Sequence, residues 1–518
     1  MALDLASSVQ ANLDSLPFFR PELALTAGTL VLLGLDLAWR RAPRRRALLS
    51  AAALFVLAAA GALLAFQPGQ AASLFNGMVA SDGFATFWKW LFLGAGAMAV
   101  LVVMLSREIA PERVGEFHAL LVAVVLGMFL MASATDLIMM YLAIELVSMT
   151  SYVLAGFRRG DRRASEAALK YVIYGGVASG VMLFGMSYLY GLTGTFSFET
   201  LGPRLAQALS SAGTALPAAR LAAVVAVVFV SAGVGYKIAA VPFHMWCPDV
   251  YEGAPTPFTA FLSVGPKAAG FALALRLFLT VFSGPASAHG LFQGLGDVPW
   301  PIVLVVVSMA TMTLGNLVAI SQTNLKRLLA YSSIAHAGYA LMGVAAASAA
   351  GAQAVMIYLA VYLVMNLGAF GVVMQVAQST GSESILDYRG LVRRQPFTAV
   401  LFVAFLLSLT GLPPFAGFIG KWYLFTAVWV RTAEADGGWY AALLVVAALN
   451  TAVSLYYYAR IIRAMFLDAP YVAEPAPLRP SVGWNLFLGA CGAAVVLFGV
   501  LPQPVIDWTV AALDGWPR

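Results

Sequence analysis

Lysines inside apolar stretches are the residues of this sequence best suited to chemistry. Only six of the thirty basic residues are lysines, and Lys237, Lys267 and Lys421 lie within or beside otherwise apolar runs. Arginine stays charged at any realistic pH, whereas a lysine amine in a low-dielectric site can exchange a proton near neutrality. A charge at the bilayer centre costs roughly 2.5 to 3.5 kcal/mol, so such lysines need partners or water. The pattern indicates proton transfer.

Glu145 is the acid expected to act with these amines. It lies in the middle of the apolar stretch DLIMMYLAIELVSMTSYVLAGF, and the next stretch carries Glu166 and Lys170, one helical turn apart. An acid and an amine on adjacent helices can set each other's protonation, which predicts a functional pairing of Glu145 with Lys170. A static buried ion pair is the alternative.

Lys237 and Lys421 adjoin helix breakers. Pro242 follows the first lysine in GYKIAAVPFHMWCPDVYEGAPTP, and Pro413 and Pro414 precede the second in SLTGLPPFAGFIGKW. Proline removes a backbone donor and interrupts a helix, and the freed groups at membrane depth must be satisfied by protein or water. A broken helix with an ionisable residue at the break is typical of an ion path. The alternative is a pair of kinks whose lysines extend to the interface.

Lys267 follows Gly265 and Pro266 near the start of its expected helix, so it either serves the path or extends to the interface. Lys326 and His336, ten residues apart in NLKRLLAYSSIAHAG, are separated by about 15 Å of helix rise, which suits two stations of a proton path.

Lys326 adjoins Arg327 and could equally anchor the helix at the interface. His336 has Ser332, Ser333 and Tyr339 nearby, and imidazole both donates and accepts protons near neutral pH; a satisfied core histidine is the alternative.

The other candidates are weaker. His244 lies in the broken segment and could link Lys237 with Lys267, or only cap carbonyls. Lys89 stands between two tryptophans, which predicts a membrane-interface residue. His118 and His289 are expected at the ends of spans.

The composition of the chain predicts the environment in which these residues lie. The chain has 518 residues, of which 61% are hydrophobic and 10% charged, with a mean hydropathy of +0.86. A soluble protein has about a quarter of its residues charged, so this chain is expected in a lipid bilayer. Two cysteines and four histidines without metal-ligand spacing predict no cofactor or metal in this chain. GFIGKW lacks the first glycine of a phosphate loop, so no nucleotide is expected. The arginines fall in short clusters between apolar runs, as in a membrane protein, so nucleic acid is not expected either.

About 20 apolar residues cross a bilayer as a helix. This criterion predicts an all-α polytopic membrane protein with about fourteen transmembrane helices, the seventh and twelfth broken. The expected spans are 22–39, 47–66, 83–105, 117–134, 136–157, 168–190, 220–241, 256–283, 300–320, 328–347, 352–378, 397–430, 438–466 and 483–503.

Arginine placement predicts the orientation. Clusters at 40–46, 158–163 and 389–394 fall in alternate loops, which places those loops in the cytoplasm and both termini on the outer, periplasmic side. The N-terminus has no basic residue before Arg20, so the first span is expected to be retained rather than cleaved as a signal peptide.

The two broken spans lie five helices apart, and each follows a span rich in tyrosine, glycine and small residues. An odd offset means that two copies cross the membrane in opposite senses, as in inverted repeats. The expected organisation is helices 1–3 over 1–116, a first repeat of helices 4–8 over 117–283, a second of helices 9–13 over 284–467, and helix 14 within 468–518.

These segments resemble a known family. EAALKYVIYG, GYKIAAVPFHMWCPDVYEGAPTPFTAFLSVGPKAAGF, SQTNLKRLLAYSSIAHAGY and LPPFAGFIGKWYLF are similar to the antiporter-like membrane subunits of proton-pumping NADH:quinone oxidoreductase, respiratory complex I. The resemblance spans nearly the whole chain, although Cys247 stands where it would lead us to expect threonine. It implies roles in proton transfer for Glu145, Lys170, Lys237, Lys267, Lys326, His336 and Lys421.

The resemblance also implies partners and location. The chain would join other membrane-arm subunits, including sister antiporter-like subunits, in the bacterial inner membrane. NADH, FMN, iron–sulfur clusters and quinone would be held by other subunits, and their electron transfer would drive proton translocation here. The alternatives are a subunit of a multi-subunit sodium/proton antiporter and a purely structural spacer of the membrane arm.

Overall fold

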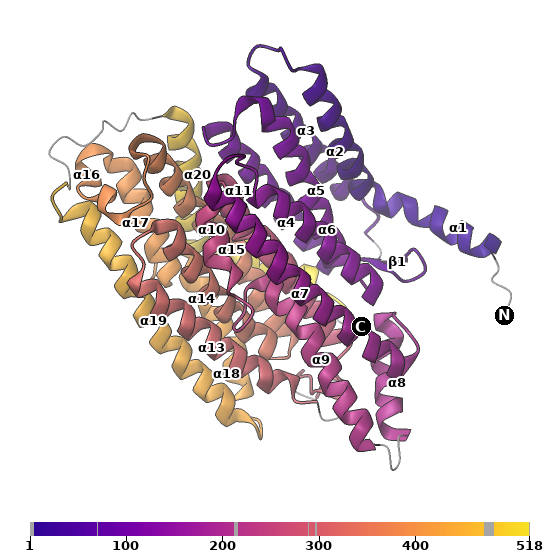
Figure 1. Cartoon of the computed structure of the whole chain (residues 1–518). Coiled ribbons are helices and arrows are strands. Elements are labelled where there is room, and N and C mark those ends of the chain that lie inside the picture. Colours follow the sequence, from indigo (N-terminus) through magenta and orange to yellow (C-terminus); the bar gives the residue numbers. More distant parts are fainter. Residues whose placement is uncertain are drawn as a thin grey trace.

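Helices make up nearly all of the computed structural model, which describes residues 5–69, 71–211, 216–287, 290–295, 298–470 and 481–516 (Figure 1). The first half contains α1 (Leu5–Ser15), α2 (Arg20–Ala38), α3 (Arg45–Ala65), α4 (Gly83–Leu105), α5 (Val114–Ser133), α6 (Leu137–Ala155), α7 (Arg162–Thr193), α8 (Phe198–Ser211), α9 (Leu216–Ile238), α10 (Trp246–Gly253), α11 (Thr256–Leu262) and α12 (Gly265–Thr280). The second half contains α13 (Trp300–Ser321), α14 (Leu325–Ala345), α15 (Ala349–Thr380), α16 (Leu391–Arg394), α17 (Pro396–Thr410), α18 (Ala416–Arg431), α19 (Gly437–Phe466), α20 (Val482–Val500) and α21 (Gln503–Ala512).

The described residues contain thirteen helical stretches that are long and apolar enough to cross a membrane. The twelfth expected span is divided into α17 and α18, each shorter than those thirteen. The all-α polytopic class and the expectation of about fourteen spans are therefore confirmed.

The seventh span breaks where its prolines predict. α9 ends at Ile238, and α10 resumes at Trp246 after an irregular turn. Freed backbone groups at this turn are satisfied by protein: the Trp246 indole donates to the Tyr236 carbonyl at 3.1 Å, and Thr311 Oγ1 accepts from the Val241 amide at 3.0 Å. The eighth span is likewise divided, into α11 and α12.

The twelfth span breaks between Thr410 and Ala416. Gly411 ends α17 with a φ of +91°, a left-handed conformation that glycine adopts without strain. The Thr410 carbonyl, which has lost its helical partner, accepts a hydrogen bond from Lys421 Nζ at 2.7 Å. The break thus positions this lysine directly.

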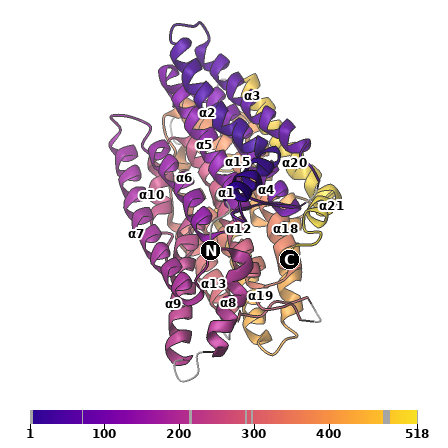
Figure 2. The same ribbon diagram turned by 90° about the vertical axis from the view of Figure 1, so that its right-hand side faces the viewer.

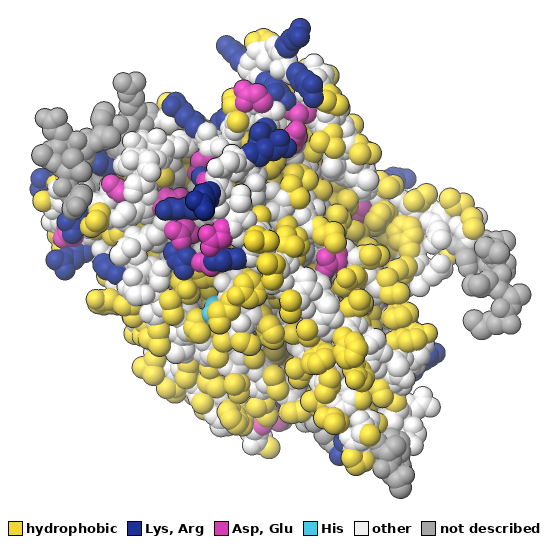
Figure 3. Space-filling view, in the orientation of Figure 1, with side chains coloured by type: hydrophobic (Ala, Val, Ile, Leu, Met, Phe, Trp, Pro, Cys, Tyr) yellow, Lys and Arg dark blue, Asp and Glu magenta, His cyan; other side chains and the backbone are white. Residues whose placement is uncertain are grey.

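Three helical segments form the interior of the bundle. Residues of α11–α12, α14 and α15 are almost all buried, whereas α2, α3, α7, α19 and α20 expose many apolar side chains. Figure 2 shows α12 and α15 within the bundle. The exposed side chains make an apolar surface, and Lys and Arg gather toward one end of the molecule (Figure 3). Such a surface suits a lipid environment.

Matching backbone bonds recur in the two halves. The amide of Leu137, the first residue of α6, donates to Phe196, and the amide of Leu325, the first residue of α14, donates to Glu383. α7 and α15 each have 32 residues, and each is followed by a glycine with positive φ, Gly194 and Gly381.

Several short elements lie outside the expected spans, among them a hairpin and the helices α8 and α21. A two-stranded antiparallel hairpin of β1 (Ala72–Leu74) and β2 (Val79–Ser81) precedes α4. α8 follows α7, and α21 packs against α4 and α15. Each is too short for a span criterion to detect.

Candidate functional site

Lys237 lies in the last turn of α9 and is buried. Its Nζ donates to Ser148 Oγ on α6 at 3.0 Å. Ser148 is one helical turn beyond Glu145 on α6, and Glu145 accepts a hydrogen bond from Ser179 on α7. The alternative that Lys237 extends to the membrane interface is wrong.

Lys170 does not pair with Glu145 in the described chain. Its Nζ contacts Asp249 at 2.6 Å and Glu166 at 2.7 Å, and its side chain is 37% exposed. The register between α6 and α7 places Glu145 beside Ser179, nine residues and about 13 Å along the helix from Lys170. Neither the direct pair nor the static buried ion pair is therefore present.

Lys170 instead belongs to an ion-pair network at the arginine-rich end. Arg327 Nη1 contacts Asp249 at 2.7 Å and Glu252 at 2.8 Å, so the network joins α7, α10 and α14. Glu166 is mostly exposed at its edge.

Lys326 is fully buried rather than anchored at an interface. Its Nζ donates to the Ala254 carbonyl at 2.8 Å and lies 3.3 Å from Glu383. Lys326 therefore connects α14 to the start of the eighth span and to the loop after α15.

Lys267 is buried and directed into the bundle. Its Nζ donates to Ser333 Oγ on α14 at 2.6 Å and lies 5.6 Å from the centre of the Tyr251 ring. Cys247 Sγ lies 4.0 Å away. The alternative that this lysine extends to the interface is wrong.

Lys237, Lys267, His336 and Lys421 together are called the lysine line below. His336, its third member, lies on α14. It bonds to the Tyr358 hydroxyl through Nδ1 and lies 3.5 Å from the Tyr458 hydroxyl through Nε2. Tyr458 also bonds to Ser332, the neighbour of Ser333. Both imidazole nitrogens therefore face a hydroxyl, and hydroxyls can donate as well as accept.

Lys421 ends the line beyond His336. In addition to the Thr410 carbonyl, its Nζ contacts Thr451 Oγ1 at 3.3 Å and lies 4.2 Å from the centre of the Tyr339 ring. The Tyr339 hydroxyl contacts the same Thr451 oxygen at 3.1 Å. Ser333, His336 and Tyr339 are spaced by three residues, so one face of α14 connects Lys267 with Lys421.

The step from Lys237 to Lys267 has no direct hydrogen bond in the described chain. The two lysines are nevertheless neighbours, because a Cβ added to Gly270, one turn beyond Lys267, would lie 3.3 Å from Lys237 Cγ. Glycine at this position lets α9 and α12 approach closely. His244 is buried near this region, but no hydrogen bond joins it to either lysine among the described residues.

Lys89 is not an interface residue. It is 2% exposed, and its Nζ lies 2.7 Å from Oε1 of Glu22, which is fully buried. The flanking tryptophans suggested an interface position, but Lys89 faces the bundle, where Glu22 on α2 is its partner. His118 is also buried, near the start of α5, and contacts Ser50 at 2.9 Å; His289 lies outside the described residues.

An ion pair between Arg276 and Asp82 holds α12, the helix that carries Lys267. Arg276, nine residues along α12, binds both oxygens of Asp82 at 2.9 and 3.0 Å and donates to the Ala132 carbonyl. Burial opposes ionisation of Asp82, but the adjacent Arg276 guanidinium outweighs it and holds the pKa of this carboxyl below its usual value. Asp82 caps α4, so the pair fastens α12 to the N-terminal helices.

Several partners were missed by sequence reasoning. Ser148 could have been found from its one-turn spacing to Glu145, and Asp249 from its place in the broken segment. Tyr358, Tyr458 and Thr451 had no local signal, because their role depends on which helices meet.

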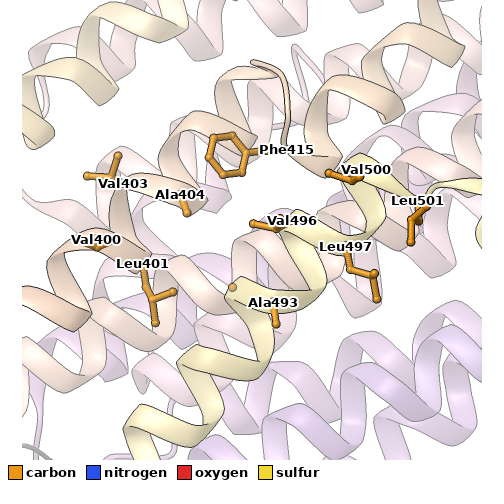
Figure 4. Close-up of a pocket in the computed structure, with 11 residues that line it drawn as sticks. Val400, Leu401, Val403, Ala404, Phe415, Ala493, Val496, Leu497, Val500 and Leu501 are labelled. Carbon is orange, nitrogen blue, oxygen red and sulfur yellow. The ribbon is translucent and has the colours of Figure 1, made fainter.

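The apolar groove in Figure 4 is not part of this site. It has a volume of about 900 Å³ and is walled by α17 and α20, with Val400, Leu401, Val496 and Leu497 among its lining residues. Its walls offer almost no polar atoms, so it cannot hold or move a proton.

Comparison with known proteins places this geometry in a family. Residues 134–451 match the family described as NADH:quinone oxidoreductase/Mrp antiporter, TM. The NADH-quinone oxidoreductase subunit N of Anaeromyxobacter sp. (strain Fw109-5) is 64% identical over 507 residues, which cover 98% of both chains. A chain of respiratory complex I from Thermus thermophilus has a TM-score of 0.73 at 34% identity, covering 94% of this chain and 98% of that one.

A chain of the Mrp complex from Dietzia sp. DQ12-45-1b shares the fold, with a TM-score of 0.78 at 21% identity and coverage of 97% and 98%. The identities of 64% and 34% to the NADH-quinone oxidoreductase and complex I chains are higher than the 21% identity to the Mrp chain, which favours the oxidoreductase branch of the family. The chain therefore belongs to the antiporter-like membrane subunits of NADH-quinone oxidoreductase, respiratory complex I, in the subunit N group.

Proposed function

We propose that this subunit conducts protons along Lys237, Lys267, His336 and Lys421, with Glu145 and Lys170 receiving the driving signal. The observation that carries the proposal is the face of α14, where Ser333 binds Lys267 and Tyr339 shares Thr451 with Lys421. These contacts offer hydroxyls and an imidazole within hydrogen-bond reach of buried amines, which is what proton transfer requires.

Two opposing effects act on the protonation of Lys237 and Lys421, the first and last members of the line. Lys237 lies in the last turn of α9 and Lys421 bonds the last carbonyl of α17, and the partial negative charge of a helix C-terminus favours an ammonium. Burial disfavours the same charge. A modest change in nearby charge can then add or remove the proton.

The driving signal would arrive through charge rather than direct contact. Quinone reduction elsewhere in the complex would alter the electric field at Glu145. Glu145 lies one helical turn from Ser148 on α6, and Ser148 binds Lys237. Lys170 would respond through Asp249, which also binds Arg327 beside Lys326. Glu166 and His244 would have secondary roles in this scheme. Transfer from Lys237 to Lys267 would use an intervening water, because no direct bond joins them.

The two halves would act as inverted repeats over 117–283 and 284–467, flanked by helices 1–3 in 1–116 and helix 14 in 468–518. The recurring bonds at Leu137 and Leu325 and the equal lengths of α7 and α15 support this division. The two copies would place Lys237 and Lys421 at corresponding helix breaks.

The subunit would carry no redox centre. NADH, FMN, iron–sulfur clusters and quinone would be bound by other subunits, and neighbouring membrane-arm subunits, including the sister antiporter-like subunits, would be its partners. The arginine clusters support an inner-membrane orientation with both termini in the periplasm. The sodium/proton antiporter alternative is less well supported, because the 64% identical relative is an oxidoreductase subunit.

The test compares Glu145→Ala and Lys237→Ala with Glu199→Ala, an exposed acid on α8, in the assembled complex. We expect the first two to lower proton pumping by at least about tenfold per NADH oxidised, because a positioned proton-transfer group typically contributes about a hundredfold or more. Assembly, followed by blue native electrophoresis, should remain intact. Wild-type pumping in an intact variant complex would favour the structural spacer instead.

A further inference from the structure

A groove at the arginine-rich end has the form of a lipid site. It has a volume of about 320 Å³ and lies over α5, which packs against both α2 and α6. Ala119, on α5, has a small side chain, so that the flanking helices leave a hollow beside it. Thr29, Leu33, Leu120, Val153 and Phe157 make the groove walls mainly apolar.

Two arginines stand at one end of this groove. Arg113 precedes α5 and Arg159 follows α6, so both lie where the spanning helices end. Neither side chain has an ion pair or hydrogen bond within the part of the chain that the structure describes. Arg45 and Arg158, at the same end, are each paired with an acid.

The polar and apolar parts are arranged along the helix axes. Thr29 is nine residues before the end of α2, so the groove reaches about 13 Å from the helix ends into the apolar layer. A ligand that fits must carry a negative group at one end and a hydrocarbon chain directed into the membrane. A soluble anion would leave the apolar length empty.

We propose that this groove binds an anionic phospholipid, with the phosphate between Arg113 and Arg159 and one acyl chain over Ala119 between α2 and α6. Arginine binds phosphate oxygens through two parallel N–H donors, and basic residues at the membrane surface attract anionic headgroups. Complementary charge and depth are the reasons for this occupant.

Glu116 also lines the groove, one turn along α5 from Arg113. Its carboxylate opposes a phosphate, but two arginines against one glutamate leave the rim positive. Removing this acid should therefore strengthen retention of the lipid rather than weaken it.

The test uses the intact complex in nanodiscs with a phosphatidylglycerol probe that carries a photoreactive diazirine in one acyl chain. We expect cross-links to residues 113–120 and 153–159, and few from a phosphatidylcholine probe with the same chains. Arg113→Gln with Arg159→Gln should lower the phosphatidylglycerol cross-links by at least about tenfold. Arg162→Gln, a neighbouring exposed arginine that does not line the groove, is the matched control and should change nothing.

A second variant tests the hydrocarbon part. Val153 is 56% exposed, so Val153→Trp fills the groove without disturbing the core and should also reduce the cross-links. Glu116→Gln should raise them. Unchanged labelling in the double arginine variant, equal labelling by phosphatidylcholine, or displacement of the probe by inorganic phosphate alone would overturn the proposal.

Discussion

Lys267 Nζ donates a hydrogen bond to Ser333 Oγ at 2.6 Å, and this contact joins the two halves of the lysine line. Lys267 is on α12 in the first half, whereas Ser333 is on the face of α14 that continues to His336 and Tyr339. Both residues are buried, so bulk water does not compete for the contact. The contact makes Ser333 the most informative single position to change.

Ser333→Ala should reduce proton pumping by at least about tenfold, because Lys267 loses its partner toward α14. Ser333→Thr keeps a hydroxyl and should retain most of the activity. The measurement is proton uptake by vesicles that contain the complex, normalised to NADH oxidation. Equal pumping by the alanine and threonine variants would show that the hydroxyl has no role.

Gly411→Ala should displace Lys421. A Cβ at Gly411 would lie 2.7 Å from Lys421 Cδ, and the φ of +91° would add strain of about 1 to 3 kcal/mol. Gly381→Ala is the matched control, since Gly381 also has a positive φ, +70°, but its added Cβ would meet open space. We expect both variants to lose stability and only Gly411→Ala to lose pumping.

The same pumping assay and a thermal melting curve of the complex would test this comparison. A parallel loss of pumping in both variants would attribute the effect to backbone strain rather than to Lys421.

Lys89→Met should destabilise the protein by about 3 to 5 kcal/mol, because the buried Glu22 carboxylate loses its partner. Replacing both members, Lys89→Met with Glu22→Gln, should recover most of this loss. Chemical unfolding of the full chain in detergent provides the measurement. A double variant as unstable as the single one would show that the pair does not act as a unit.

Asp82→Asn should cost about 3 kcal/mol at neutral pH, since buried Arg276 loses its counter-ion. The pKa of Asp82 is lowered on folding, so its stabilisation is complete above the ordinary aspartate pKa of about 3.9 and is lost as the pH falls through the lower folded-state value. The stability gap between wild type and variant should be constant from about pH 5 to 8 and shrink below about pH 4. Melting curves across this range test the sign, and a gap that widens in acid would contradict the pairing.

Local properties of the chain were sufficient for the architecture. Span length and proline placement are written in consecutive residues, so the membrane class, about fourteen spans and the breaks beside Lys237 and Lys421 followed from the sequence. The burial of Lys237, Lys267 and Lys421 followed for the same reason. Ser333 and Tyr339 were also recognisable, because they share the helix of His336.

The partner of each charge depended on the packing between helices. Helix rotation and register, which no local pattern records, placed Glu145 beside Ser179 instead of Lys170, and Lys89 beside Glu22 instead of at the membrane surface. They also brought Tyr358 and Tyr458, from distant helices, to the two nitrogens of His336. Apolar spacing specifies which residues enter a bundle, but contacts between residues far apart in sequence form only when the helices pack.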